Sequence, residues 1–453
     1  MVNEAIKKWY ELNTSYVNAL SDDIWEHPEV GMDSPYAGKA TADFLERYGF
    51  EVQLLDGAMK GNPPNTVVAK FGSGKPVIGI VGEFDALPGL GNDCTPYFSP
   101  REGAGHGCGH NLMAAGCAAA AAALKDAMVA ENIPGTLVYY GCPAEETFEG
   151  KVHMIHNNLF EGCDAALCWH PMQGAPDIVE MRLNAVYNII IEYKGKTAHA
   201  GGEPEKGRSA LDAAELTNVA VQYLREHVTR DVTMHHIYLS AGQAPNIVPD
   251  YAALNYFLRA SDMQTCRELY ERVKKCAMGA AMATETEVSF QIKAASYDNL
   301  INHTLNKVLY EAALKVPEVE YTDEEREFAR EIVKNVTGEE PKIEPLETKV
   351  KAPTGVERTV GGSSDVGDLS YNLPTTQFWA YVRINGAPGH HWNTTALCKH
   401  SIGHKGQIAG GQVMAQAGYD LFKDPSKVGD AWAEFNKSME GRPPYHCWMD
   451  DVE

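Results

Sequence analysis

The sequence is poor in basic residues and lacks long apolar runs. Its 453 residues include 39 lysines and arginines against 61 aspartates and glutamates, which gives a formal net charge of −22. This imbalance disfavours binding to nucleic acid or to an anionic membrane surface, and it favours solubility. No stretch reaches the roughly 20 apolar residues of a membrane span, and the run AAGCAAAAAAL is too short. We therefore expect no nucleic-acid partner and no membrane partner.

The sequence also lacks the marks of several other protein classes. The first residues, MVNEAIKKWYELN, are charged and do not contain the apolar core of a signal peptide. The ten cysteines are scattered through apolar contexts, which is typical of reduced thiols in the cytosol. No G-x-S-x-G nucleophile elbow occurs. These absences predict a cytoplasmic protein and disfavour a serine nucleophile of that type.

The first third of the chain alternates apolar strands with helix-like stretches. Strands are expected at residues 76–81 and in the segments GTLVYYGC and DAALCWHP, with a helix over residues 111–130. Such alternation predicts an α/β fold with a mostly parallel sheet, whose ligands collect at the carboxyl ends of the strands. The polar candidates at these ends are Glu83, Asp85, the loop GHGCGHN at 105–111, Glu145, Glu146 and His170.

An α+β block begins near Leu183 and continues for about one hundred residues, within the usual size of a domain. Its expected strands are NAVYNIIIEYKG, HHIYLSAG, YAALNYFLRA and EVSFQIKAA, and its helices are RSALDAAELTNVAVQYLREHV and MQTCRELYERVKKCAMGAAM. The chain then reads as α/β again, and Thr322 with Glu325 forms a capping box that opens a surface helix. These changes predict an inserted domain at 184–296 between two parts of a catalytic domain, 1–183 and 297–453.

The loop GHGCGHN carries a thiol and an imidazole that could point at one ion. Cys108 and His110 supply donors that suit zinc and related divalent metals. Each candidate has a structural explanation when it stands alone: a buried cysteine packs in a core, adjacent glutamates begin a solvated helix, and a lone histidine such as His170 forms core hydrogen bonds. The combination of these donors at strand ends favours a metal site.

Motifs along nearly the whole chain resemble those of the M20 metallopeptidase and amidohydrolase family. In chain order they are DDIWEHPEVG, GKPVIGIVGEFDALPGL, GHGCGHNLM, YYGCPAEE, ALCWHP, KGKTAHAGGEPEKGRSALDA, PNIVPD, GGSSDVGDLSYNLP, GAPGHHWN, SIGHKG and PYHC. The pattern is most similar to the p-aminobenzoyl-glutamate hydrolase B-subunit type of the aminoacylase-like branch. This resemblance implies a zinc-exopeptidase-like catalytic domain with a mixed, mostly parallel sheet, and an inserted α+β ferredoxin-like domain for dimerisation or as a lid.

The resemblance also implies roles for individual residues. The positions that match its metal ligands are Cys108, His110, Glu146, His170 and His390. Glu145 matches the general base, and His199 matches a histidine that reaches the active site of the partner subunit. The positions that match substrate contacts are Asn246, Arg259, Gly362 and Ser363. Asn111 and Glu83 differ from the broader branch, in which aspartate is common at both positions.

The activity implied by the resemblance is hydrolysis of an amide bond by a metal-dependent enzyme. Two divalent ions per subunit, Mn²⁺ or Zn²⁺, would activate a water, and Glu145 would act as the base. The substrate would be a small N-acyl or N-aroyl amino acid such as p-aminobenzoyl-glutamate. The enzyme would be a homodimer, to which a further paralogous subunit could be added.

Three alternatives stay open at this point. A dipeptidase, or an aminoacylase with a different acyl group, would use the same residues. A non-catalytic metal-binding subunit would lack a ligand or the base, whereas all the expected positions are filled. A cysteine nucleophile is disfavoured because Cys108 lies so close to other residues of metal-ligating type.

Overall fold

A computed structural model of the chain describes residues 1–55, 57, 63–173, 177–178 and 180–451. By internal contacts the chain divides into two compact units. Unit 1 consists of Met1–Met181, Leu300–Arg358 and Leu369–Tyr445, and unit 2 consists of Arg182–Asn299, Thr359–Asp368 and His446–Glu453. The domain limits predicted from the sequence stay a prediction, and residues 452–453 of the last predicted segment lie outside the described ones.

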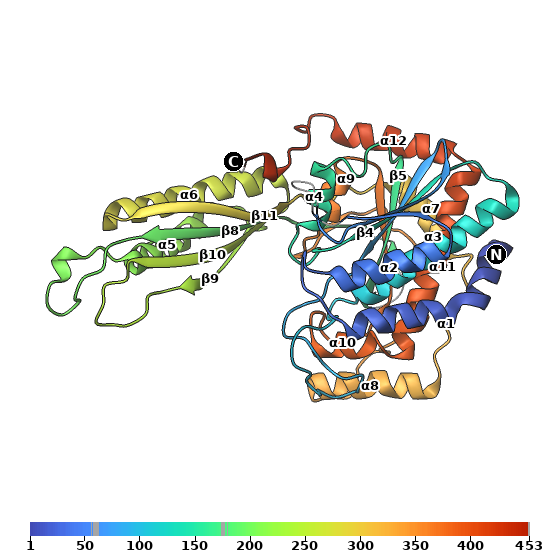
Figure 1. The fold of residues 1–453 in the computed structure, drawn as a ribbon, viewed down its shortest axis with the longest axis horizontal. Coiled ribbons are helices and arrows are strands. Elements are labelled where there is room, and N and C mark those ends of the chain that lie inside the picture. Colours follow the sequence, from blue (N-terminus) through green and yellow to red (C-terminus); the bar gives the residue numbers. More distant parts are fainter. Residues whose placement is uncertain (56, 58–62, 174–176, 179, 452–453) are drawn as a thin grey trace. The chain divides into compact units, whose positions relative to one another are not determined.

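A mixed sheet forms the centre of unit 1 (Figure 1), and its described strands run in the order β1-β2-β4-β3-β5-β13-β6. Their bounds are β1 Glu51–Leu54, β2 Val67–Ser73, β3 Val77–Glu83, β4 Gly135–Cys142, β5 Ala165–Gln173, β6 Asp177–Ile178 and β13 Thr375–Arg383. The neighbours β4, β3, β5 and β13 are parallel, while the pairs β1–β2, β2–β4 and β13–β6 are antiparallel. Strands β4 and β13 are buried along their whole length, as expected for inner strands that are covered on both faces. The predicted α/β fold with a mostly parallel sheet is confirmed.

Helices pack around this sheet and against one another. They are α1 Glu4–Glu26, α2 Pro35–Arg47, α3 His110–Glu131, α4 Gly150–His156, α7 His303–Ala313, α8 Asp323–Thr337, α10 Trp392–Leu397, α11 Ser401–Lys423 and α12 Ser426–Met439. The helix predicted at 111–130 corresponds to α3, which contacts β3, β5, α1 and α11. Helix α8 begins with the predicted capping box, in which Thr322 and Glu325 bind each other's backbone N–H groups.

Helix α3 is longer than its alanine run suggests. Among the described helices it is the one long and apolar enough to cross a membrane by length and composition. The sequence-based judgement that no stretch reaches that length was therefore wrong. However, 83% of its most apolar window is buried inside the structure. Its apolar composition is explained by packing in the core between α1, α11 and the sheet.

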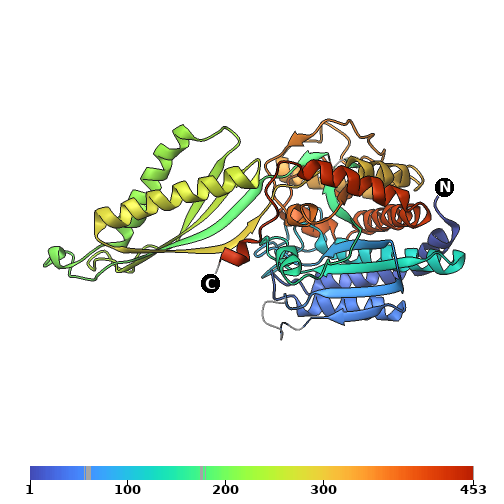
Figure 2. The ribbon, with the colours of Figure 1, turned by 90° about the horizontal axis from the view of Figure 1, so that it is seen from above.

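Unit 2 contains a second sheet with its own helices. Its main elements are β8 Ala185–Lys194, α5 Ala210–Leu224, β9 Thr233–Ser240, β10 Tyr251–Ala260, α6 Met263–Thr284 and β11 Glu287–Ser296. The strands pair antiparallel in the order β11-β8-β10-β9. Figure 2 shows both helices on one face of this sheet. The order strand–helix–strand, strand–helix–strand is that of a ferredoxin-like fold and confirms the predicted α+β domain.

Short elements complete the described chain. They are β7 Met181–Arg182, β12 Arg358–Thr359, α9 Val366–Ser370, and the 3-10 helices η1 Pro204–Lys206, η2 Arg225–His227 and η3 Trp448–Asp451.

Candidate metal centre

The loop before α3 carries two of the predicted ligands. His110 is the first residue of α3, and Cys108 lies two residues before it. Between them Gly109 has a φ of +98°, and a Cβ at this position would lie 2.9 Å from the Cβ of Pro171. Glycine is therefore required, because a side chain would strain the backbone and collide with β5. This turn sets the directions in which the thiol and the imidazole point.

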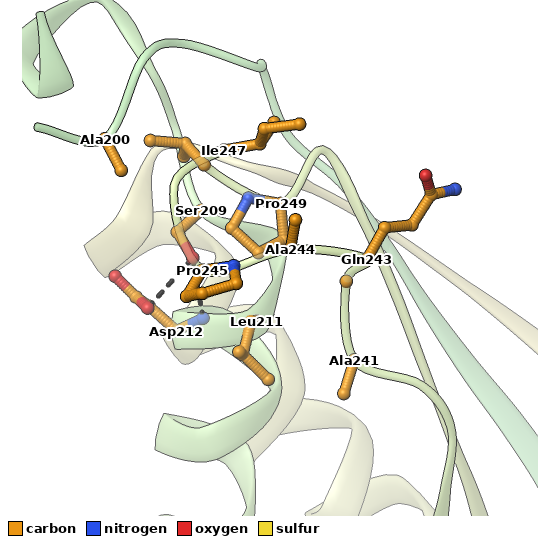
Figure 3. A pocket seen from close by; sticks show the side chains of 12 residues that line it. Ala200, Ser209, Leu211, Asp212, Ala241, Gln243, Ala244, Pro245, Ile247 and Pro249 are labelled. Atoms are coloured by element: carbon orange, nitrogen blue, oxygen red, sulfur yellow. Dashed lines mark hydrogen bonds between the residues drawn. The ribbon is translucent and has the colours of Figure 1, made fainter. Parts of the chain in front are cut away.

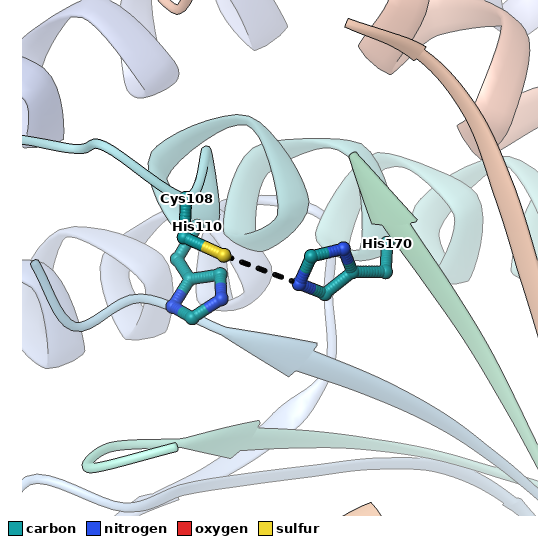
Figure 4. A group of neighbouring side chains, drawn as sticks. All are labelled: Cys108, His110 and His170. Carbon is teal, nitrogen blue, oxygen red and sulfur yellow. Dashed lines mark hydrogen bonds between the residues drawn. The ribbon is translucent and has the colours of Figure 1, made fainter. Parts of the chain in front are cut away.

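Cys108 is shared by two groups of potential ligands, and within each group the donor atoms lie within 4.8 Å of one another. One group consists of Cys108, His110 and His170, and the other of Cys108, Glu146 and His390. In Figure 4 the side chains of Cys108 and His170 point toward each other, with 3.5 Å between Sγ and Nε2. In the second group Nε2 of His390 lies 3.6 Å from Oε2 of Glu146. The structure thus brings all five predicted ligands together around one thiol.

These ligands come from different elements of unit 1. His170 lies inside β5, which continues to Gln173, and not after the strand as the sequence suggested. His390 follows β13 in a loop and has a φ of +50°, and Ala144, just before the paired glutamates, has a φ of +56°. Non-glycine residues rarely adopt this conformation, and such strain is concentrated at functional sites.

His110 is oriented by Asp85. Its Nδ1 lies 3.1 Å from the backbone oxygen of Asp85 and 3.2 Å from Oδ1 of the same residue. Two acceptors at Nδ1 indicate that this nitrogen carries a proton, which makes Nε2 the ring nitrogen that a cation would bind. Nε2 of His110 and Oε1 of Glu146 are buried and have no hydrogen-bond partner among the described residues. Unsatisfied buried atoms of these ligand types fit a bound divalent cation.

Most of the centre is buried and charged, although the side chain of His390 is 53% exposed. Burial raises the pKa of the Cys108 thiol to about 11 and the pKa of Glu146 to about 7. Burial would also raise the pKa of Asp85, but hydrogen bonds from His110 and from the backbone N–H of Glu146 lower it below its usual range. A cation would need to displace protons from the thiol and from Glu146, so metal binding at this centre depends on pH.

Glu145 lies beside these groups and belongs to neither of them. Its Oε2 is 3.9 Å from Nε2 of His110, and its side chain is only 9% exposed. A carboxylate near the ligands but outside the shared set can exchange protons with a water held there. Its predicted role as general base is compatible with this position.

Two cationic residues that were not predicted from the sequence also lie at the centre. Arg383, the last residue of β13, places Nη2 2.7 Å from Sγ of Cys108. Lys151, in α4, is fully buried, and its Nζ lies 2.6 Å from Oε1 of Glu83. The position of Arg383 at the end of an apolar strand was an available signal. No local pattern marks Lys151, because its burial arises from tertiary packing.

The remaining predicted site residues belong to unit 2. His199 is exposed, and its Nδ1 accepts hydrogen bonds from the N–H groups of Gly201 and Gly202 at 3.1 and 3.0 Å. Asn246 is also exposed, and its carbonyl oxygen accepts from the N–H of Ala200 at 3.0 Å. The segments that carry the two residues are joined here, because His199 also forms an isolated antiparallel bridge with Ile247, the neighbour of Asn246.

Arg259 lies next to the glycine-serine loop of unit 2. Its Nη1 donates to the carbonyl oxygen of Gly361 at 2.8 Å, and the carbonyl oxygen of Gly362 accepts from the N–H of Asn184. Nε of Arg259 and Oγ of Ser363 are buried and have no hydrogen-bond partner among the described residues. The predicted substrate contacts Arg259, Gly362 and Ser363 therefore lie in one region. Two of these side chains have a polar atom there that could form a hydrogen bond with a substrate.

A pocket of about 540 Å³ opens in unit 2 beside the segment that carries Asn246. Its polar side chains include Ser209 and Asp212, which bind each other at the start of α5 with 2.8 Å between Oγ and Oδ1 (Figure 3). Most of the other lining residues are alanine, proline and aliphatic residues. Because the helix cap already uses the polar pair, we assign no chemistry to this pocket.

Comparisons with known sequences identify the family of the chain. The model of the family described as peptidase family M20/M25/M40 matches residues 79–391. The chain is 34% identical over 454 aligned positions to the B subunit of p-aminobenzoyl-glutamate hydrolase of Escherichia coli (strain K12), and the match covers 94% of this chain and 93% of that protein. It is 27% identical to the Xaa-Arg dipeptidase of Mus musculus, with 94% and 90% covered.

A solved structure has the same fold. The YXEP protein of Bacillus subtilis, described as a dinuclear metal binding peptidase from the M20 family, aligns with a TM-score of 0.59 and 18% identity. The alignment covers 91% of this chain and 99% of that one, and at this identity it shows the fold alone. The family match over most of the chain and the relative at 34% identity establish that the chain belongs to peptidase family M20/M25/M40 and is a metal-dependent amidohydrolase or peptidase.

Proposed function

We propose that this protein hydrolyses the amide bond of small N-acyl or N-aroyl amino acids, with two divalent cations bound at the candidate metal centre. The observation that carries the proposal is the pair of ligand groups that share Cys108, with Glu145 beside them. Each group would hold one cation, and Cys108 is a member of both groups. Mn²⁺ and Zn²⁺ both suit this mixed set of sulfur, nitrogen and oxygen donors.

The residues of the chain would orient the donors and move one proton. Divalent cations, when bound, would lower the pKa of a bound water and polarise the scissile carbonyl. Glu145 would accept the proton of that water and later deliver it to the leaving nitrogen. Asp85 keeps the proton of His110 on Nδ1, and Arg383 stabilises the thiolate of Cys108 by a charge-assisted contact.

Residues of unit 2 would bind the substrate and its developing negative charge. Because Nδ1 of His199 already accepts two backbone hydrogen bonds, the proton of a neutral ring lies on Nε2, which can donate to an oxyanion. The guanidinium of Arg259 suits the carboxylate of the amino-acid portion. Asn246, Gly362 and Ser363 would add polar contacts. We assign His199 to the active site of the partner subunit.

The surface of unit 2 supports a homodimer. Strand β9 is an edge of its sheet. Large apolar residues are exposed on β9 and on one side of α5: Ile237, Tyr238, Leu239, Leu216, Val219 and Tyr223. An unpaired edge beside an apolar stripe is typical of a surface that a second molecule covers. A second copy of this chain is the occupant that would also bring His199 to a neighbouring centre.

p-Aminobenzoyl-glutamate is the first substrate to test, because the relative at 34% identity belongs to the hydrolase named for it. Other N-acyl amino acids and dipeptides fit the same chemistry, and a dipeptidase is among the relatives. Since the relative at 34% identity is the B subunit of its enzyme, a paralogous subunit is a further partner to test. A non-catalytic role is disfavoured because the base and all five ligands are present. We propose a cytoplasmic location.

The experiment is a hydrolysis screen of the purified protein after reconstitution with Mn²⁺ or Zn²⁺. The substrates are p-aminobenzoyl-glutamate, other N-acyl amino acids and dipeptides, and release of the free amine is measured. We expect a chelator to abolish activity and added metal to restore it, with Glu145→Gln as the metal-loaded inactive control. If the fully metallated protein cleaves none of these amides, alone or with a paralogous subunit, the proposal is wrong.

A further inference from the structure

A buried ion pair next to the metal centre has no place in the proposed set of five ligands. Glu83 is the last residue of β3, and Lys151 lies in the first turn of α4. Both side chains are fully buried, with 2.6 Å between Nζ and Oε1. Lysine and glutamate are rarely buried completely, since removing two charges from water is costly even when they pair. The pair therefore calls for a functional explanation.

The two carboxylate oxygens of Glu83 have different surroundings. Oε1 accepts a hydrogen bond from Lys151. Oε2 lies 3.3 Å from Nε2 of His110, and neither atom has a hydrogen-bond partner among the described residues. Because Nδ1 of His110 faces Asp85, Nε2 is the ring nitrogen that faces Oε2. Two buried lone pairs at this distance repel each other, so either a proton on Nε2 or a bound cation must lie between them.

Glu83 also belongs to a third group of potential ligands. Glu83, His110 and Glu145 offer donor atoms that all lie within 4.8 Å of one another, and the group shares His110 with the first group around Cys108. We propose that Glu83 is a sixth protein ligand, which binds through Oε2 the cation that His110 binds, and that Lys151 positions it through Oε1. This inference rests on the proposed function, because it presupposes the metal centre.

Lys151 would have a second effect on the centre. Acidic side chains already surround the ligands, including Asp85, Glu145 and Glu146. With Lys151 on its other oxygen, Glu83 adds a ligand atom while its negative charge is balanced. The competing explanation is an ion pair that only joins β3 to α4 and does not contact a cation. Metal affinity separates the two explanations.

The test compares two double variants that carry the same substitutions. Glu83→Gln/Lys151→Met removes the pair at the centre, and Glu325→Gln/Lys405→Met removes a pair of the same length, 2.6 Å, elsewhere in unit 1. Removing both members of a pair leaves no unpaired buried charge, so both variants are expected to fold. Metal content is measured by elemental analysis, metal affinity by competition with a chromophoric chelator, and folding by thermal unfolding without metal.

We expect Glu83→Gln/Lys151→Met to bind one cation about 10-fold to 100-fold more weakly than the wild type. The control variant should keep the wild-type affinity even if its melting temperature falls. Glu83→Asp keeps both charges but shortens the side chain that carries the carboxylate, so it should show the same loss of metal affinity. This variant replaces the double variant in the test if the double variant does not fold. Wild-type affinity for both cations in every foldable Glu83 variant would overturn the inference and leave the proposed function intact. A wild-type protein that binds no cation would instead overturn the proposed function.

Discussion

Most candidate residues of unit 1 are buried or half-buried, with His390 as the exposed one, whereas His199 and Asn246 of unit 2 lie at its surface. His110 and Glu83 are inaccessible to solvent, and charged partners from distant segments hold them in place. His199 and Asn246 are exposed, and backbone groups close by on the surface fix their positions.

This difference separates two ways of building a site. Buried donors with fixed neighbours are preorganised, which suits a cation whose position must be set accurately. Exposed donors on a small sheet domain suit contacts with a second molecule, either a substrate or another protein chain. If the difference is functional, substitutions in unit 1 should change metal binding. Substitutions in unit 2 should change turnover or assembly at full metal content.

Glu145→Gln should be the exception to this expectation. The residue lies in unit 1, yet its substitution should change turnover and not metal binding. The amide preserves the shape of the side chain but cannot accept the proton of a water. We expect the rate of amide hydrolysis to fall by about 10²-fold to 10⁴-fold while both cations stay bound. Steady-state kinetics together with elemental analysis measure the two effects. Wild-type turnover in this variant would show that Glu145 is not the base.

His199→Ala should follow the expectation for unit 2, with lower turnover at unchanged metal content. Loss of one donor to an oxyanion typically lowers kcat by about 10²-fold to 10³-fold. Because the residue belongs to unit 2, metal content should not change. The matched control is His227→Ala, which removes another exposed histidine of unit 2 and should keep wild-type kinetics. An unchanged kcat in the His199 variant would exclude the proposed donor.

Mixing two inactive chains tests whether His199 acts across the interface between two copies. In a mixed dimer of Glu145→Gln and His199→Ala chains, one site would contain both intact residues. Random pairing makes about half of the dimers mixed, so activity should return to about a quarter of the wild-type rate per chain. If exchange of chains between dimers is confirmed and no activity returns, His199 serves its own chain or has no role in the reaction.

Loss of a ligand should lower metal binding in unit 1. Cys108→Ser weakens the shared donor of both groups, and His170→Ala removes a donor from one of them. We expect metal affinity to fall by at least about 10-fold to 100-fold, since even the groups that orient a ligand have effects of that size. Cys94→Ser, which alters a cysteine outside these groups, is the control. Full occupancy in both variants would mean that the ligand set is wrong.

Metal affinity should rise with pH in two stages. The pKa of Glu146 is raised to about 7 and that of Cys108 to about 11, so a cation must displace a proton from each below pH 7. Above pH 7 Glu146 has already lost its proton, so the cation displaces one proton fewer. Apparent affinity should therefore rise more steeply below this value than above it, by about one additional power of ten per pH unit. Chelator competition over a pH series measures the slopes, and a single slope throughout would contradict this assignment.

The smallest expected effect concerns assembly. Ile237→Lys places a charge on the exposed edge strand β9 and should weaken dimer formation. The folded monomer should keep its metal affinity, because the ligands lie in unit 1. Val129→Lys, at an exposed position of α3, is the control. Sedimentation velocity measures the association, and equal dimer content in both variants would place the interface elsewhere.

Much of this architecture was predictable from the sequence because local patterns determine it. Apolar runs of strand length gave β3, β4 and β5 within a few residues, and the capping box at Thr322 gave the start of α8. The spacing of Cys108 and His110, on either side of a glycine before an apolar helix, was sufficient to single out the loop. These features depend on residues close together in the chain, so the local composition and the periodicity of apolar residues are sufficient to predict them.

The tertiary structure decided what each ligand touches. Asn111 donates through Nδ2 to the carbonyl oxygens of Ser21 and Cys398, a role that a carboxylate cannot fill. Lys151 and Arg383 reach the centre from α4 and β13, far from Cys108 in the chain. The order of residues in the chain sets which donor types are present and where the turn that presents them lies. Their partners, burial and shifted pKa values were decided only by packing, because no local pattern records which distant side chains will share a region from which water is excluded.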